Sequence, residues 1–122
     1  MTVSEEVSYG LSQAMEYNPT SGRDFADLTI LAGWFVPAES WDDRAGIWLV
    51  EFKDGARFAM IGGHDSTGWD CRSNLDLHPF EKWEEQLTAY YSEYTHRASL
   101  TEIVTSIKAQ LAARTPLDGG RQ

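Results

Sequence analysis

Cysteine is nearly absent from this sequence of 122 residues, since Cys71 is the single one. A lone thiol excludes an internal disulfide and a zinc site built from several thiolates. Long apolar runs are absent too, because none approaches the roughly 20 residues that a membrane-spanning helix needs. The first six residues contain two Glu and no basic residue, whereas a secretory signal peptide begins with basic residues. We therefore expect a cytoplasmic protein that makes no use of a membrane.

Basic residues are also scarce. Ten Lys and Arg stand against nineteen Asp and Glu, which gives a formal net charge of −9. Residues 1–95 carry a net −11, whereas residues 96–122 carry a net +2. A surface this acidic repels the phosphate backbone of nucleic acids, so we expect no direct nucleic-acid binding. The charge suits a protein partner with a basic surface, and it also serves solubility.

The chain shows no internal division. It contains no repeat, low-complexity tract or linker rich in Pro, Gly or Ser, so residues 1–122 are predicted to form a single domain. Residues 3–17 predict an amphipathic helix, because apolar residues recur at steps of three and four. Gly10 weakens this helix, and Asn18-Pro19 ends it. We expect a loose C-terminal tail from about residue 116 to residue 122.

The centre of the chain has the pattern of β-strands. Three apolar segments of strand length follow one another, at residues 28–36, 47–53 and 57–61. Asp54-Gly55 separates the second from the third and is the strongest short-range signal of a β-hairpin. Alternation within the second segment places Trp48, Val50 and Phe52 on one face and Leu49 on the other. These segments predict an antiparallel meander of three strands or slightly more.

Two amphipathic helices are predicted after the strands. The first begins at Pro79, a residue suited to the first position of a helix, and its expected core face is Phe80, Trp83, Leu87, Tyr90, Tyr91 and Tyr94. The second follows the capping-box sequence Ser99-Leu100-Thr101-Glu102 and is expected to end at Thr115-Pro116. An N-terminal helix, a meander and two C-terminal helices packed on it make an α+β fold.

Residues 62–74 form a long polar passage, which we expect to be an ordered loop with a function. Within it, Gly63-His64-Asp65-Ser66-Thr67-Gly68-Trp69-Asp70-Cys71 resembles the G-x-D-x-T-G-W-D-C signature of small uncharacterised bacterial and phage proteins. In those proteins the signature also follows a β-hairpin, usually with an aromatic residue at the place of Ser66 and Gln at the place of Arg72. The resemblance implies a recurring local structure and no activity.

Two kinds of catalytic chemistry fit this passage weakly. A metal site would use His64, Asp65 and His78, with or without Cys71, but their spacing matches no familiar ligand pattern. Nucleophilic catalysis would use Cys71 with His64 or His78 as the base. Neighbouring carboxylates raise the pKa of a thiol and therefore oppose this second use.

Recognition of a ligand or partner is the third use and the one that we carry forward. Recognition sites combine aromatic side chains with a few converging polar groups. A purely structural alternative is that Trp69 closes the sheet edge while Asp70 holds the loop together. The predicted binding residues are His64, Asp65, Trp69, Asp70, Arg72 and Trp41, with Trp34 near the same end of the sheet.

The sequence lacks phosphate-binding, dinucleotide-binding and nucleophile-elbow motifs, and we assign no catalytic residue, metal or cofactor. A non-enzymatic role is favoured, although enzymatic activity stays open. We expect an acidic binding protein that covers the working surface of a macromolecular partner, as a phage inhibitor of a host defence system does. One alternative is an immunity protein against a basic nuclease toxin. Another is a protein that binds a small nucleotide signal, with residues 62–74 forming the entrance of the binding site. The oligomeric state is not predicted.

Overall fold

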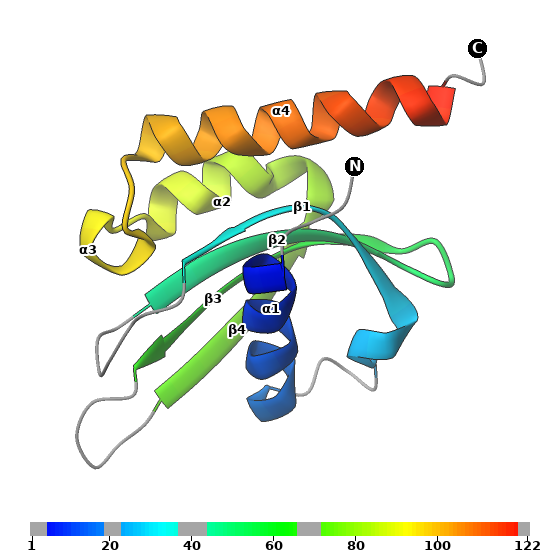
Figure 1. The fold of residues 1–122 in the computed structure, drawn as a ribbon. Coiled ribbons are helices and arrows are strands. Elements are labelled where there is room, and N and C mark those ends of the chain that lie inside the picture. Colours follow the sequence, from blue (N-terminus) through cyan, green and yellow to red (C-terminus); the bar gives the residue numbers. More distant parts are fainter. Residues whose placement is uncertain (1–4, 19–22, 37–43, 66–71, 120–122) are drawn as a thin grey trace.

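The computed structural model describes residues 5–18, 23–36, 44–65 and 72–119. Along the chain the main elements are α1 (Glu5–Tyr17), β1 (Leu28–Phe35), β2 (Arg44–Phe52), β3 (Arg57–Asp65), β4 (Arg72–Pro79), α2 (Trp83–Tyr90), α3 (Glu93–His96) and α4 (Leu100–Gly119). Short 3-10 helices at Phe25–Asp27 and Phe80–Lys82 precede β1 and α2. Helices packed on an antiparallel sheet confirm the α+β class (Figure 1). No helix within the described ranges is both long and apolar enough to span a membrane.

The strands form one antiparallel sheet in the order β1-β2-β3-β4. The meander of the first three strands is confirmed, and β4 is a fourth strand that the sequence analysis missed. The expectation of a loop over residues 62–74 is wrong at both ends, because β3 continues to Asp65 and β4 begins at Arg72. Polar residues can extend a sheet in this way because the ladder hydrogen bonds come from the backbone.

Helices cover both faces of the sheet (Figure 1). On one face α1 contacts all four strands over a core that includes Trp48 and Phe52. On the other face α2 and α4 enclose a second core that includes Leu49, Leu87 and Ile103. The predicted alternation of side chains along β2 is therefore confirmed, and it separates the two cores.

The nearly continuous apolar run of β1 has a structural cause. Ile30 lies opposite Val50 in the core beneath α1, whereas Ala32 lies opposite Leu49 in the core beneath α2 and α4. The pairing register shifts between Ile30 and Ala32. An extra residue at this point, Leu31, reverses the alternation, so that one short strand supplies apolar side chains to both faces.

Glycine allows α1 to approach the sheet closely. A Cβ atom on Gly10 would lie 2.5 Å from the ring of Phe35, and one on Gly33 would lie 2.6 Å from Val7. Beneath the helix, the indole N–H of Trp48 donates to the carbonyl of Val7 over 2.8 Å. Gly10 costs helix propensity, but it provides the space in which α1 docks.

The outer edge of β1 is covered by a side chain of α4. The Gln110 amide accepts a hydrogen bond from the Gly33 N–H and donates one to the Gly33 carbonyl, each over 3.0 Å. The same amide nitrogen lies 3.1 Å from the hydroxyl oxygen of Ser106. Gln110 thus takes the place of a neighbouring strand, which protects an edge that would otherwise offer unpaired backbone groups.

The C-terminal helices differ from the expectation in two places. The single helix expected after Pro79 is interrupted, because α2 ends at Tyr90 and α3 begins at Glu93. Tyr90 consequently is not a core residue and is 49 % exposed, whereas Tyr91 packs against the core. α4 continues past Pro116, its expected end, to Gly119. So close to a helix C-terminus, the missing N–H of a proline removes a single hydrogen bond.

The β2–β3 hairpin turns at Asp54-Gly55, as predicted. Gly55 has a φ of 91°, a conformation that glycine adopts without strain. The Asp54 carboxylate accepts hydrogen bonds from the Ala56 N–H over 3.0 Å and from the Arg23 guanidinium over 3.1 Å. The hydrogen bonds from Ala56 and Arg23 hold the pKa of Asp54 below its usual value of 3.8. Backbone conformation and side-chain bonding therefore both fix this turn.

Candidate functional site

The site predicted from the sequence lies at the end of the sheet where β3 leaves and β4 returns. Three of its residues, Trp41, Trp69 and Asp70, fall outside the described residues, as do most of the residues of the G-x-D-x-T-G-W-D-C resemblance. The other three, His64, Asp65 and Arg72, are strand residues instead of loop residues.

The strand register brings these three positions together. Asp65 pairs with Arg72 across β3 and β4, and His64 lies between Ser73 on β4 and Arg44 on β2. Residues directly opposite each other in an antiparallel pair have Cβ atoms about 5 Å apart. This end of the sheet therefore places one acidic and three ionisable basic positions on three adjacent strands.

The same register separates the residues of the metal-site alternative. His64 pairs with Ser73, whereas His78 pairs with Ala59 near the other end of β4. The five residue steps from Ser73 to His78 correspond to about 17 Å along a strand. Among the described residues, no group of three or more His, Cys, Asp or Glu side chains could hold a metal ion.

Trp34 and His78 make contacts with the rest of the fold. The Trp34 indole donates to the carbonyl of His96 over 3.0 Å, and its ring packs against the core beneath α2 and α4. The ring of His78 lies 5.7 Å from that of Tyr90, and its buried Nε2 has no hydrogen-bond partner in the described part of the chain. Neither side chain is therefore arranged for recognition at the predicted site.

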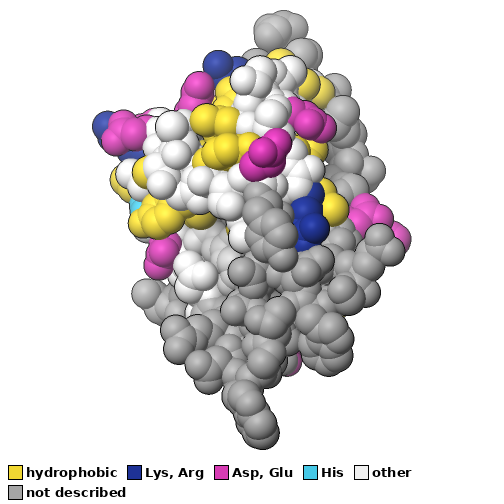
Figure 2. Space-filling model, turned by 90° about the vertical axis from the view of Figure 1, so that its left-hand side faces the viewer, with side chains coloured by type: hydrophobic (Ala, Val, Ile, Leu, Met, Phe, Trp, Pro, Cys, Tyr) yellow, Lys and Arg dark blue, Asp and Glu magenta, His cyan; other side chains and the backbone are white. Residues whose placement is uncertain are grey.

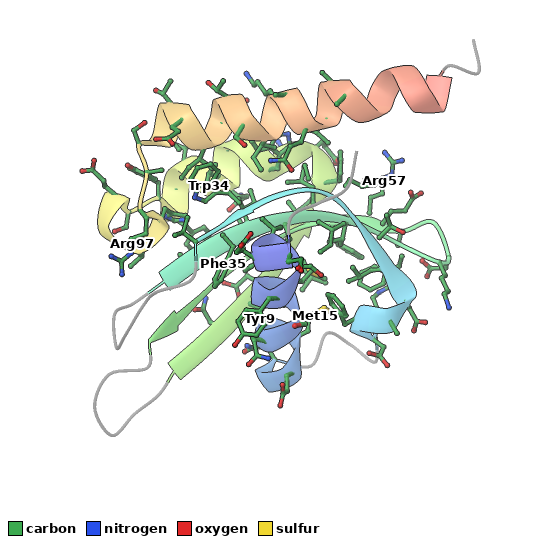
Figure 3. The ribbon with its side chains drawn as sticks, viewed as in Figure 1. Tyr9, Met15, Trp34, Phe35, Arg57 and Arg97 are labelled. Atoms are coloured by element: carbon green, nitrogen blue, oxygen red, sulfur yellow. The ribbon has the colours of Figure 1, made fainter. Side chains whose placement is uncertain are left out.

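A second candidate surface lies on α1 and was missed by the sequence analysis. Glu5, Glu6, Tyr9 and Glu16 are all exposed, and we call these four residues the α1 outer face. Tyr9 is 52 % exposed, which is unusual for a large side chain in this structure, and it lies on α1 in the layer in front of the sheet (Figure 3). The sequence does indicate the α1 outer face, because residues 5, 9 and 16 share the helix side opposite to Val7, Leu11 and Ala14.

The acidic residues of α1 have no basic partner among the described residues. Elsewhere on the described surface the ion pairs include Arg23–Asp54, Lys53–Asp27, Arg57–Glu51, Lys82–Glu85 and Lys108–Glu84. α1 contains three glutamates and no basic residue, and none of these glutamates pairs with a described base. Exposed acids such as Glu81 and Glu102 share this state, but α1 combines its glutamates with an exposed tyrosine on one helix side.

The end of the molecule at α3 has a different character. Figure 2 shows hydrophobic patches with acidic side chains spread around them. At the opposite end, a hollow of about 320 Å³ lies between the start of β1 and the β2–β3 hairpin, and Asp27, Glu51 and Lys53 are among its lining residues. Lys53 pairs with Asp27, and Glu51 pairs with Arg57, so this hollow has little net charge to offer a charged ligand.

Comparison of the chain with family models, curated proteins and solved structures finds no match.

Proposed function

We propose that this protein is a non-enzymatic acidic binding module, and that the α1 outer face covers a basic surface of a partner protein. The observation that carries the proposal is the exposed Tyr9 between glutamates that lack a described counter-charge. Tyrosine is one of the side chains that contribute most to protein–protein binding energy. Unpaired carboxylates around such an anchor attract a basic partner and raise the rate of encounter.

The biological role that fits this mode of binding is inhibition by occlusion. A basic surface that binds nucleic acid is blocked when an acidic protein covers it, and no catalysis is required. A phage inhibitor of a host defence system works in this way, and so does an immunity protein that neutralises a basic nuclease toxin. The proposal favours the phage inhibitor, and both roles rest on charge and size, which are general properties.

The test begins with the partner. The tagged protein is used to recover a partner from host lysate, and the purified partner is then titrated by calorimetry at several salt concentrations. We expect a basic partner whose affinity falls with rising salt, because charge attraction between exposed groups is screened. An acidic partner, or an affinity that does not change with salt, would overturn the proposal.

Variants locate the binding surface. Tyr9→Ala should weaken binding at least about tenfold, as loss of an interface anchor does, and Glu5→Gln with Glu16→Gln should reduce the salt dependence. Glu81→Gln with Glu102→Gln is the matched control, because it removes the same charge from exposed positions outside α1. Equal effects of the α1 pair and the control pair would show that the partner does not bind at α1.

A second candidate function rests on the register at the other end of the sheet. Arg44 and His64 lie opposite each other on β2 and β3 and therefore share one face of the sheet, whereas Arg72 lies opposite Asp65 on the other face. We propose, as the alternative, that the Arg44 and His64 positions bind the phosphates of a small nucleotide signal. ATP and a cyclic dinucleotide are suitable probes, because a ligand that binds the native state raises the melting temperature. Arg44→Ala should abolish this rise, whereas Arg57→Ala, at the hairpin end of β3, should leave it. No rise with any probe would exclude the alternative.

A further inference from the structure

Residues 91–98 join α2 to α4 through α3, and we call them the 91–98 connector. Hydrogen bonds and a ring contact hold this segment in place. The Trp34 indole donates to the His96 carbonyl over 3.0 Å, and the Tyr91 hydroxyl donates to the Ala98 carbonyl over 2.8 Å. The rings of Tyr91 and His96 stack with their centroids 5.6 Å apart. Figure 3 shows Trp34 and Arg97 at this end of the molecule.

The connector also contains a backbone conformation that favours opening. Arg97 has a φ of 64°, which lies in the left-handed region, and no other non-glycine residue of the described chain has a positive φ. A bulky side chain in this region costs roughly 1 kcal/mol, so the surrounding contacts must maintain it. Here the contacts on either side of Arg97, made through His96 and Ala98, do so.

His96 is the buried ionisable group at the centre of these contacts. Its side chain is 1 % exposed. Its Nδ1 lies 3.0 Å from the Ser92 carbonyl oxygen and 3.2 Å from the Ser92 backbone nitrogen, so it donates to the carbonyl in one neutral tautomer and accepts from the N–H in the other. Its Nε2 is buried and has no hydrogen-bond partner among the described residues. With the proton on Nδ1, Nε2 presents only a lone pair, which is less costly to bury than an N–H group or a charge.

We propose that the 91–98 connector is an acid-sensitive hinge, in which protonation of His96 opens α3 and releases the start of α4 from β1. Protonation leaves an N–H on both ring nitrogens, including the buried Nε2, and places a positive charge on the ring. Among the described residues the charge gains no buried counter-ion, so the open state, in which water reaches the ring, becomes favoured.

The groups around His96 do not offset this charge. The connector itself contributes the neutral hydroxyl of Tyr91, and β1 contributes the indole of Trp34. Glu93 on α3 and Glu102 on α4 are the acids on the flanking helices, and both are exposed and therefore screened by solvent. The basic residue next in sequence is Arg97, and a positive charge opposes protonation.

The direction of the pH effect follows from the burial of the ring. Burial lowers the pKa of His96 below its usual value of 6.5, against the opposing effect of its bond to Ser92. A histidine with a lowered pKa in the closed state stabilises that state fully above pH 6.5 and loses this contribution as the pH falls below 6.5. Each pH unit in this range then increases the ratio of open to closed connector by up to about tenfold.

The test compares two indole N–H groups in one protein by NMR hydrogen exchange between pH 8 and pH 5. The Trp34 indole reports the connector, and the Trp48 indole, which is bonded to Val7 on the opposite face, is the internal control. After correction for the intrinsic exchange rate, we expect protection of Trp34 to fall below about pH 6.5 while protection of Trp48 stays constant. Parallel loss at both indoles would mean global unfolding and would overturn the hinge, and so would unchanged protection at both.

Histidine variants identify the titrating group. His96→Asn keeps a donor near the Ser92 carbonyl but cannot be protonated, so the loss of Trp34 protection in acid should disappear. His78→Asn is the matched control, because it also removes a histidine whose Nε2 is buried, and it should keep the acid response. If His96→Asn does not fold, titration of the His96 ring in the unaltered protein decides the question. A ring pKa at or above 6.5 overturns the proposal, and a pKa below 6.5 together with selective loss of Trp34 protection supports it.

Discussion

The two faces of the sheet are held to their helices by different means. Beneath α1, glycines at positions 10 and 33 bring the helix backbone close to the strands, and the rings of Phe35 and Trp48 fill the remaining space. Beneath α2 and α4 the core is mostly aliphatic, and polar side chains such as Gln110 and Trp34 bind backbone groups across the layers. The α1 layer is positioned mainly by close packing, with one indole hydrogen bond from Trp48 to Val7, whereas the α2 and α4 layer relies more on side-chain hydrogen bonds to backbone groups.

This difference predicts how each face responds to change. A close-packed contact between rings and glycines leaves no space for additional atoms, so an added methyl group displaces the whole helix. A layer joined by individual hydrogen bonds loses them one at a time, and each loss is modest because water can replace the missing partner near an edge. The following substitutions test this contrast, beginning with the largest expected effect.

Trp48→Ala should be the most destabilising of these changes. The side chain is 1 % exposed, and its removal leaves a cavity beneath α1 and deprives the Val7 carbonyl of its indole partner. We expect the free energy of unfolding to fall by about 3–5 kcal/mol, as measured by urea denaturation. Trp34→Ala, a half-buried tryptophan on the opposite face, should lose only about 2 kcal/mol. Equal losses would contradict the contrast between the two faces.

Gly10→Ala tests whether α1 is positioned by shape. Alanine is favoured over glycine in a helix by about 1 kcal/mol, but its Cβ would lie 2.5 Å from the Phe35 ring. Because overpacking costs about 1–3 kcal/mol, we expect a net destabilisation of up to about 2 kcal/mol in thermal and urea denaturation. In a Phe35→Leu background the same change should become neutral or stabilising, since the ring that it meets is gone. If Gly10→Ala is equally destabilising in the Phe35→Leu background, contact with the Phe35 ring is not the cause of the destabilisation.

Gln110→Ala should have the smallest effect of the three. It leaves the N–H and carbonyl of Gly33 to water at the sheet edge, for which we expect a loss of about 1 kcal/mol. Gln110→Glu should not restore stability, because a carboxylate accepts from the Gly33 N–H but cannot donate to its carbonyl. Thr105→Ala, an exposed change on the same helix, is the control. A Glu variant as stable as the unaltered protein would show that the donated bond contributes nothing.

The parts of the fold that the sequence predicted are those with a local signal. The spacing of apolar residues correctly predicts that Leu11 lies on the buried side of α1 and Ile107 on the buried side of α4, and Asp54-Gly55 correctly predicts the hairpin turn. β4 has such a signal in the alternation of Leu75 and Leu77 with polar neighbours, but it lies next to a glycine-rich passage that is more typical of a loop. The interruption between α2 and α3 has no clear sequence signal, because tyrosines continue the helical spacing across it.

The candidate sites show where local reasoning ends. His64, Asp65 and Arg72 were grouped because they are close in sequence, and the strand register does place Asp65 opposite Arg72, whereas His64 lies on the other face of the sheet. Trp34 was grouped with them by its position on a strand end, but it binds the His96 carbonyl, 62 residues away in the chain. The contacts of His96 likewise depend on how α3 returns to the sheet, which no spacing within one segment encodes. Long-range packing therefore determines which aromatic side chains are available to a partner.

The contacts of α1 with all four strands have a consequence for biosynthesis. α1 is made before the strands, yet the surface that buries its apolar side is complete only after β4 ends at Pro79. The four strands can pair in order, each with the one just synthesised, because every connection in the meander joins neighbours. The nascent chain therefore carries the apolar α1 segment unburied while the sheet is being assembled. An early segment of the polypeptide thus waits for the four strands before it reaches its native place, and during that interval it is a natural target for a ribosome-associated chaperone.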